Sequence, residues 1–221
     1  TVARLRNRPS RFRSSITRQA VWHARPADST YGGMKMKRVL VLGLSVLATF
    51  FWAGPVTAEY KAALDKNPNS LLAHMSLGMI YDSQKKPDLA KEHYRQALKI
   101  SPNFPPAANN LAYLYAEKGE NLDEALNLAQ GAKEMAPEDP HVSDTLGWVY
   151  YRKNIHGRAV THLQEAAEKA PQNPAIRYHL GMAYLKQGDK GNAKKELKKA
   201  LDLSSQFPGA EEAKTALQNL G

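Results

Sequence analysis

Cysteine is absent from the 221 residues of the chain. This absence excludes disulfide scaffolds, cysteine-ligated zinc sites, thiol nucleophiles and lipidated-cysteine anchors. The sequence also lacks the HExxH, phosphate-loop, GxSxG and dinucleotide-binding motifs. Six histidines follow residue 59, and none is spaced i, i+4 from another, so we interpret them as surface histidines. The sequence therefore predicts no catalytic residue, no metal site and no cofactor.

Acidic residues are scarce in the first 38 positions, which carry ten Lys and Arg against one acid, Asp28. The formal net charge of the whole chain is +10. From Glu59 onward, however, 21 basic residues stand against 20 acidic ones. Nucleic-acid binding depends on clustered positive charge that neutralises phosphates. Because the body of the chain is nearly neutral, we expect no nucleic-acid partner.

One long uncharged apolar run, residues 39–54, follows Lys35, Lys37 and Arg38 and precedes small residues that end at Ala58. This order is typical of a secretory signal that is cleaved after Ala58. An uncleaved membrane anchor through residues 39–56 and a soluble buried helix are the alternatives, since about 20 apolar residues are needed to span a bilayer. The basic residues would hold the N-terminus in the cytoplasm. Residues 34–58 therefore predict a bacterial protein that is exported across, or anchored in, the inner membrane with its body on the extracytoplasmic side.

Residues 1–33 are rich in Arg and Ser and poor in acids. We interpret them as a disordered or extraneous leader, for which no folded structure is expected. An organelle transit peptide has a similar composition and is the alternative.

The remainder of the chain repeats itself with a period of 34 or 35 residues. A Leu-Gly or Leu-Ala pair, a Tyr three positions later, two Ala residues seven positions apart and a closing Pro recur at fixed offsets. The pairs are Leu77-Gly78, Leu111-Ala112, Leu146-Gly147 and Leu180-Gly181. The tyrosines are Tyr81, Tyr115, Tyr150 and Tyr184. A period of this length indicates stacked supersecondary units that bury a continuous core.

Each recurring position has a physical reason. Small residues such as Gly78, Ala90 and Ala97 let two helices approach closely, because a larger side chain would overpack the contact at about 1–3 kcal/mol. The Leu and Tyr positions share one helical face and are expected to fill the space between units. The turn between helices requires a left-handed residue. Gly119, Asn154 and Gly188 occupy that offset, and Lys85 occupies it in the first unit.

This pattern resembles the tetratricopeptide repeat (TPR) family over residues 71–207. The resemblance implies an all-α fold, a right-handed α-α superhelix of four full repeats. The expected units are residues 71–104, 105–139, 140–173 and 174–207. Residues 59–70 match only the end of a unit and predict a half-repeat, and residues 208–221 predict a capping helix. The half-repeat leaves an open N-terminal face through which self-association is an alternative role.

The family resemblance also implies a concave groove lined by the first helix of each unit. The expected partner-binding residues are Met75, Met79, Asn109, Tyr113, Asp144, Trp148, Tyr151, Arg152, Tyr178, Met182 and Lys186. Aromatic and Met side chains of this kind are frequent anchors in peptide and protein recognition. Replacement of Trp148 or Tyr178 by Ala is expected to weaken partner binding with little loss of stability. The alternative is that Trp148 and Tyr113 simply pack between units.

These features predict a non-catalytic protein–protein interaction scaffold that binds a peptide or protein in the groove. The C-terminal part resembles that of bacterial exported TPR proteins, some of which accompany exopolysaccharide-export and exosortase systems. The chaperone-binding members of the family grip a carboxylate with Lys, Arg and Asn. Here only Asn110 is compatible among those positions, so that specialisation is excluded. The alternatives are a docking or regulatory C-terminal part of a larger enzyme, such as a TPR-containing glycosyltransferase, and a self-assembling structural scaffold.

Overall fold

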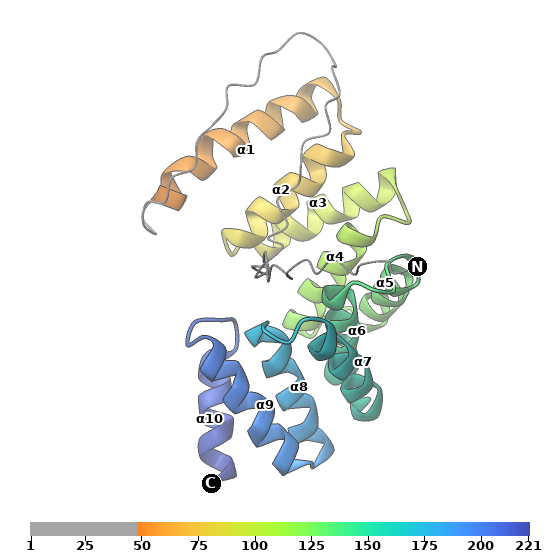
Figure 1. The fold of residues 1–221 in the computed structure, drawn as a ribbon. Coiled ribbons are helices and arrows are strands. Elements are labelled where there is room, and N and C mark those ends of the chain that lie inside the picture. Colours follow the sequence, from red (N-terminus) through yellow and green to blue (C-terminus); the bar gives the residue numbers. More distant parts are fainter. Residues whose placement is uncertain (1–47) are drawn as a thin grey trace, which may run out of the picture. The chain divides into compact units, whose positions relative to one another are not determined.

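The computed structural model describes residues 48–221, with side chains from residue 56 onward, and this part of the chain contains helices and no strands (Figure 1). The predicted leader at 1–33 and most of the predicted signal or anchor at 34–58 lie outside the described residues. The helices are α1 (Ala48–Lys66), α2 (Leu71–Ser83), α3 (Pro87–Ile100), α4 (Pro105–Lys118), α5 (Leu122–Met135), α6 (Pro140–Arg152), α7 (His156–Lys169), α8 (Pro174–Gln187), α9 (Lys190–Leu203) and α10 (Ala210–Leu220).

The helices form consecutive pairs. Each helix packs against the next one in the chain, and α4, α6, α8 and α10 also contact one another in succession. The first helix of every pair begins at the first residue of a predicted unit, at residues 71, 105, 140 and 174. Three of these helices carry Pro at the first position, where the missing N–H costs no hydrogen bond. The described chain is therefore an all-helical solenoid.

A left-handed residue ends the first helix of every pair, as the sequence predicts. Their φ angles are 59° at Lys85, 70° at Gly119, 61° at Asn154 and 92° at Gly188. The amide that follows each of them donates to the carbonyl of the recurring Tyr, at 2.9 to 3.1 Å. This closes the helix end with the hydrogen bond that a left-handed C-cap provides. The extra residue of the second unit adds one more left-handed position, Asn121 at φ 47°.

The two helices of each pair approach closely at the recurring Gly or Ala. A Cβ atom added at Gly147 would lie 2.6 Å from Cγ and 3.1 Å from the backbone N of Leu163, and Gly181 meets Leu197 in the same way. In the second unit Ala112 stands at the Gly position, and the equivalent of Leu163 is Ala129. Both alanines are fully buried. The first helix of the second unit therefore has a larger residue, Ala in place of Gly, and its second helix has a smaller one, Ala in place of Leu.

Neighbouring pairs are joined by a repeated contact between residues 20 positions apart. A polar side chain on the second helix of one pair donates to the hydroxyl of the Tyr on the first helix of the next. The contacts join Arg95 to Tyr115, Gln130 to Tyr150 and Gln164 to Tyr184, at 2.5 to 3.1 Å. At the equivalent place before the first unit, Lys61 Nζ lies 6.0 Å from the ring centroid of Tyr81. Helix α1 therefore takes the position of a second helix.

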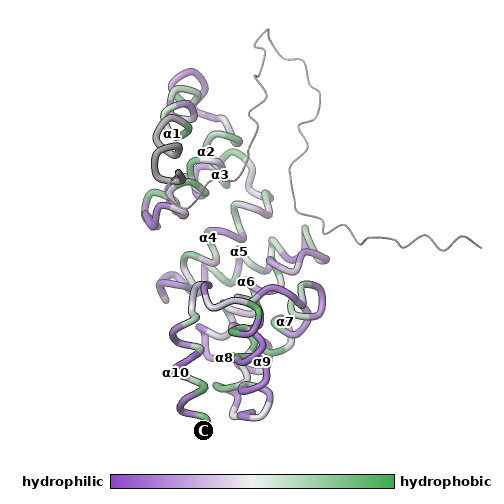
Figure 2. The backbone as a smooth tube through the Cα atoms, turned by 60° about the vertical axis from the view of Figure 1, so that its left-hand side comes forward, coloured by the Kyte–Doolittle hydropathy of each residue, from purple (hydrophilic) through white to green (hydrophobic). Residues whose placement is uncertain are grey.

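Helix α1 runs without interruption across Ala58, so the expected boundary between leader and half-repeat falls inside a helix. Its residues Tyr60 and Leu64 pack against the core next to α2. Within residues 48–221, no helix is both long enough and apolar enough to cross a membrane. Figure 2 accordingly shows hydrophilic and hydrophobic residues interleaved along α2 to α10.

Charged side chains add a cluster around the connection between α5 and α6. Lys133 on α5 donates to Glu165 on α7 at 2.6 Å and to the hydroxyl of Ser143 on α6 at 2.7 Å. Lys169 contacts the same Glu165 oxygen at 2.7 Å. Partial burial opposes ionisation of Glu165, but the two ammonium groups prevail and lower its pKa to about 2. The cluster therefore holds α5, α6 and α7 together while Glu165 is charged.

Replacement of Gly147 by Ala is expected to destabilise the fold by about 1–3 kcal/mol, because the new methyl group overlaps the Leu163 side chain and approaches its backbone. Gly131→Ala in α5 is the matched control, since an added Cβ there meets no atom within 4 Å. It should stabilise the helix by about 0.5–1 kcal/mol. Urea unfolding measures both. Equal unfolding free energies for the two variants would contradict the close packing of α6 on α7.

Glu165→Gln is expected to lower the free energy of unfolding at pH 7 by on the order of 1 kcal/mol, because the remaining solvent exposure of the carboxylate screens the pair. The pKa of Glu165 lies below the ordinary value of 4.5 in the folded chain. Its contribution is therefore complete above about pH 4.5 and is lost as the pH falls toward 2. Urea titrations at pH 7 and pH 2.5 should show the difference between variant and parent shrinking. Glu168→Gln, on the same helix and in no ion pair with another described residue, should change neither titration.

Candidate functional site

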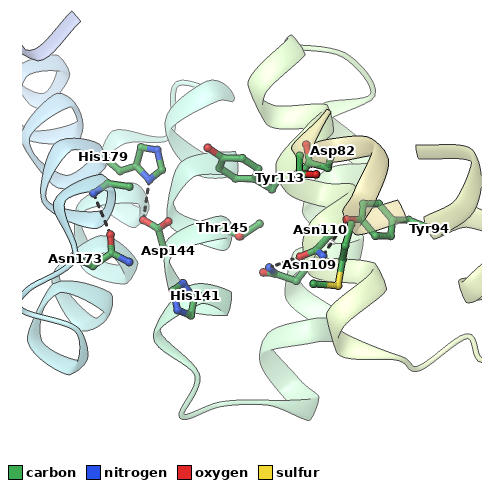
Figure 3. A pocket seen from close by; sticks show the side chains of 13 residues that line it. Asp82, Tyr94, Asn109, Asn110, Tyr113, His141, Asp144, Thr145, Asn173 and His179 are labelled. Carbon is green, nitrogen blue, oxygen red and sulfur yellow. Dashed lines mark hydrogen bonds and ion pairs between the residues drawn. The ribbon is translucent and has the colours of Figure 1, made fainter. Parts of the chain in front are cut away.

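A hollow of about 420 Å³ lies on the side formed by the first helices, and we call it the N-terminal hollow (Figure 3). Helices α2, α4, α6 and α8 all contribute to its wall. Its lining residues are Met79, Asp82, Ser83, Tyr94, Asn109, Asn110, Tyr113, His141, Asp144, Thr145, Asn173, Ala175 and His179. Four successive units are therefore needed to build this one cavity.

A second hollow, of about 370 Å³, continues along the same helices, and we call it the C-terminal hollow. Its lining residues are Tyr113, Glu117, Trp148, Tyr151, Arg152, Tyr178, His179, Pro208, Gly209 and Glu212. Tyr113 and His179 belong to both hollows. The two hollows therefore form one groove, with these two side chains at the point where they meet.

Stacked aromatic rings form the floor of the groove. The Trp148 ring lies 4.2 Å from the His179 ring and 4.5 Å from the Tyr151 ring, measured between centroids, and both pairs are stacked. Tyr178 packs at 6.1 Å against Trp148 and at 5.8 Å against Phe207. Offset stacking and edge contacts of this kind add to the energy of burial. The floor is therefore fixed before any ligand arrives.

A carboxylate orients the central imidazole from below. Asp144 Oδ1 lies 2.9 Å from His179 Nδ1, and Figure 3 shows the two side chains facing each other across α6 and α8. His179 is 2% exposed and Asp144 is 7% exposed. Burial of a polar group without a hydrogen-bond partner is unfavourable, so these two buried groups are stable only because they hydrogen-bond to each other. The hydrogen bond between His179 Nδ1 and Asp144 Oδ1 therefore fixes the orientation of the imidazole ring.

Glu117 contacts both Trp148 in the floor and Arg152 at the edge of the groove, which we call the rim. Its Oε1 accepts a hydrogen bond of 2.7 Å from Trp148 Nε1. Its backbone carbonyl accepts one of 3.1 Å from Arg152 Nη1. The indole is thereby held in place from α4, and the guanidinium sits at the last turn of α4, where the helix dipole favours a positive charge.

The tyrosines of the groove stay neutral over the ordinary pH range. Burial raises the pKa of Tyr94 to about 12. Burial also raises the pKa of Tyr113 and Tyr178, and the carboxylates of Glu117 and Glu212 act in the same direction. The pKa of Asp82 is raised as well, by its partial burial and by Glu117, while Lys85 opposes the shift. The tyrosines therefore add no negative charge to the groove, and its negative charge comes from its carboxylates.

The predicted groove residues fall into three groups. Met79, Asn109, Tyr113 and Asp144 line the N-terminal hollow, and Tyr113, Trp148, Tyr151, Arg152 and Tyr178 line the C-terminal hollow. Met182 and Lys186 lie farther along, in a separate depression against α10. Met75 lines neither hollow and packs against the core. Eight of the eleven positions therefore line the two hollows, whereas Met75, Met182 and Lys186 do not.

Burial corrects one expectation about these residues. Trp148 is 5% exposed and Tyr178 is 7% exposed, because both pack between α6, α8 and the segment that leads to α10. Truncation of a buried aromatic side chain typically costs about 3–5 kcal/mol. The expectation that Trp148→Ala or Tyr178→Ala leaves folding nearly intact is therefore wrong. Their edges line the hollow, but their rings belong to the core.

The interpretation of all six histidines as surface residues is also wrong. His74 and His179 are buried. His74 Nδ1 lies 3.0 Å from His93 Nδ1, and its Nε2 lies 3.0 Å from the carbonyl oxygen of Pro68. Such hydrogen-bonded partners remove the cost of burying an imidazole. Within residues 56–221, no cluster of three or more His, Asp or Glu side chains is placed to hold a metal ion.

Sequence reasoning missed several lining residues, among them Asp82, His179 and Glu212. Asp82 and His179 lie one turn or less from predicted positions on α2 and α8, so the helical period places them near the groove. Glu212 lies in α10, which the sequence assigns to a cap. The pairing of Asp144 with His179 joins residues 35 positions apart. That spacing equals about one period, which is the signal that could have indicated it.

Two photosystem I assembly proteins, both named Ycf3, are similar to the chain. The protein from Cyanophora paradoxa is 32% identical over 96 residues, which are 42% of this chain and 53% of the relative. The protein from Rippkaea orientalis is 32% identical over 85 residues, 37% of this chain and 49% of the relative. The chain therefore spans about half the length of these relatives.

Solved structures of low sequence identity share the fold. PilW, described as a type IV pilus biogenesis factor, superposes with a TM-score of 0.63 at 21% identity and covers 78% of this chain and 84% of that chain. YrrB, described as a TPR protein with an unusual peptide-binding site, superposes with a TM-score of 0.57 at 20% identity, covering 77% and 87%. At these identities the likeness concerns the fold alone.

Models of the tetratricopeptide repeat match three stretches of the sequence. The matched residues are 72–104, 93–127 and 156–220. Together they cover more than half of the chain and include parts of all four units seen in the structure. The all-helical solenoid and its repeated left-handed turns agree with these matches. The chain belongs to the tetratricopeptide repeat family.

Proposed function

We propose that this chain is a non-catalytic interaction scaffold that binds a segment of a partner protein in the groove formed by the N-terminal and C-terminal hollows. The observation that carries the proposal is the continuity of that groove. Tyr113 and His179 line both hollows, so a ligand chain passing over them contacts α2, α4, α6, α8 and α10 in turn. A long, shallow surface of this kind suits an extended or helical peptide.

The physical character of the groove supports the same proposal. Its floor is a stacked, hydrogen-bonded aromatic layer that needs no rearrangement on binding. Its rim carries accessible side chains, among them Met79, which is 55% exposed. A preorganised site avoids part of the entropy cost of association. Recognition at such a site depends on a few central anchors rather than on total area.

The relatives agree with a scaffold role without identifying the partner. The Ycf3 proteins are named for the assembly of photosystem I, and PilW is described as a pilus biogenesis factor. Assembly and biogenesis both require binding to other proteins. We propose the same general role for this chain, with a partner of its own.

We further propose that the chain works on the extracytoplasmic side of a bacterial inner membrane, exported by or anchored through residues 39–56. The support is the sequence of that segment, a basic stretch followed by an apolar run. A link to exopolysaccharide-export or exosortase systems stays a prediction, which rests on the resemblance of the C-terminal part.

A docking part of a larger enzyme is the second candidate function. A probable biofilm formation methyltransferase from Pseudomonas putida, WspC, is 30% identical over 97 residues, which are 44% of this chain and 23% of that protein. Similar repeats therefore occur beside a region that this chain does not match. The native size of the protein, compared with 24.5 kDa for these 221 residues, distinguishes the two candidates.

Met79→Ala is expected to weaken partner binding about tenfold, which corresponds to about 1.4 kcal/mol, because Met79 is an accessible apolar side chain of the groove. Met135→Ala is the matched control, since Met135 is 59% exposed on α5, away from the groove. Neither should change the unfolding free energy by more than about 0.5 kcal/mol. Isothermal titration with the partner measures both affinities.

The partner itself can be identified by a photo-crosslinking amino acid placed at His141, an exposed groove position, with the same amino acid at Met135 as control. The proposal expects a covalent product from position 141 and none from position 135. Equal products from both positions, or equal effects of the two Met→Ala substitutions, would contradict binding in the groove.

Leu42→Arg combined with Leu44→Arg is expected to abolish export, because each Arg costs about 2.5–3.5 kcal/mol at the centre of an inserted helix. An alkaline phosphatase domain fused after Gly221 reports the side of the membrane, since it folds only where disulfides form. The parent fusion should be active and the double variant inactive. Activity that is the same in both would count against export through this segment.

A further inference from the structure

The groove is acidic, although the chain around it is not. Among residues 56–221, four carboxylates line the two hollows, those of Asp82, Glu117, Asp144 and Glu212. In the same part of the chain Arg152 is the one guanidinium, and no Lys side chain lines either hollow. From Glu59 onward the chain has 21 basic and 20 acidic residues. The negative charge is therefore concentrated on the side of the first helices. A surface lined by one sign of charge attracts ligands of the opposite sign.

The single guanidinium of the groove is already engaged. Arg152 Nη1 donates to the backbone carbonyl of Glu117. Its other terminal nitrogen lies so close to Gly119 that an added Cβ there would be 2.7 Å away. Arg152 therefore lies at the C-terminal end of α4 and forms no ion pair with the carboxylates among the described residues. The carboxylates of Asp82 and Glu212 likewise have no ion-pair partner in the part of the chain that the structure describes.

One ring nitrogen of His179 is open at the centre of the groove. The other, Nδ1, lies 2.9 Å from Asp144 Oδ1, which fixes the ring. No described residue hydrogen-bonds to Nε2, and the side chain lines both hollows. Nε2 is therefore available to a polar group of a ligand.

Aromatic faces lie beside the carboxylates. Tyr113 and Tyr151 are half-buried and line the groove next to Glu117. A guanidinium or ammonium group is attracted to the face of an aromatic ring, and most strongly where water is displaced. A guanidinium also forms paired hydrogen bonds to a carboxylate in a way that no neutral side chain does.

We infer that the groove binds a cationic segment of the partner, in which Arg or Lys side chains contact Asp82 in the N-terminal hollow and Glu117 and Glu212 in the C-terminal hollow. This inference rests on the proposed function and adds the chemistry of the ligand to it. The segment supplies the positive charge that complements these carboxylates. Tyr113 lines both hollows and so lies between Asp82 and the two glutamates, and an aromatic ring at that place favours Arg over Lys.

Three labelled peptides of 12 residues test the inference, with Ala alternating with Arg, with Gln or with Glu. Fluorescence anisotropy with the full chain at 0.15 M salt should give a dissociation constant at least tenfold lower for the Arg peptide than for the Gln peptide. The Glu peptide should not bind. Equal affinities for the Arg and Gln peptides would overturn the inference.

A pair of matched variants separates the groove from general electrostatic attraction. The groove variant combines Asp82→Asn, Glu117→Gln and Glu212→Gln, where Gln retains an acceptor for Trp148. The control variant combines Glu124→Gln, Glu168→Gln and Asp202→Asn, three exposed acids on α5, α7 and α9 that form no ion pair in the described chain. Both change the net charge equally. The groove variant should bind the Arg peptide at least tenfold more weakly, and the control should change less than twofold.

Equal losses in the two variants would overturn the inference, because binding would then follow net charge and not the groove. Urea unfolding of both variants shows whether each is folded as the parent is. The photo-crosslinked partner segment separates this inference from the proposed function. A neutral or acidic segment attached at position 141 would overturn the cationic ligand while the scaffold role stands. No specific product at position 141 would overturn both.

Discussion

The close approach of two helices at a Gly or Ala is the contact on which the rest of the structure depends. At Gly147 and Gly181 there is no room for a side chain, because a Leu from the second helix occupies that space. The helix pairs are therefore rigid, and their repetition every 34 or 35 residues brings the first helices side by side. A groove that runs across four units exists only because each pair has nearly the same geometry. The second unit keeps that geometry with two alanines in place of Gly and Leu.

The groove has a buried floor and an accessible rim, which play different parts in folding and binding. Trp148, Tyr178 and His179 are core residues whose edges reach the surface, so they define shape and are costly to replace. Met79 on the rim is mostly exposed, so it contributes little to folding and can vary without loss of the fold. Under the proposed function, specificity is therefore a property of the rim. This separation explains how one repeat architecture serves partners of unrelated chemistry.

The 34-residue period predicted most of the fold because individual residues at fixed offsets define each helix and turn. Each left-handed turn and each small contact residue lies at a fixed offset in the repeat, so Asn154 and even Lys85 could be assigned although the residue type differs between units. The site was harder to predict. The floor depends on contacts between units, such as Asp144 with His179 and Glu117 with Trp148, which join residues 35 and 31 positions apart. The period places such residues near one another, but it does not specify which side chains pair. Burial of Trp148 follows from how α6 and α8 pack, and a helical face alone does not distinguish a rim position from a floor position.

The polar contacts between residues 20 positions apart join each pair only to its neighbour. The stability of such a protein is approximately the sum of the stabilities of its units and of the interfaces between neighbours. Its terminal units can therefore unfold while the central units stay folded. A ligand lying along the groove contacts α2 and α10 at the same time as the helices between them. It adds a long-range connection that the polypeptide itself lacks. Partner binding would therefore make units that otherwise unfold separately unfold together. Hydrogen exchange would then show similar protection of the backbone amides along the whole solenoid when the partner is bound.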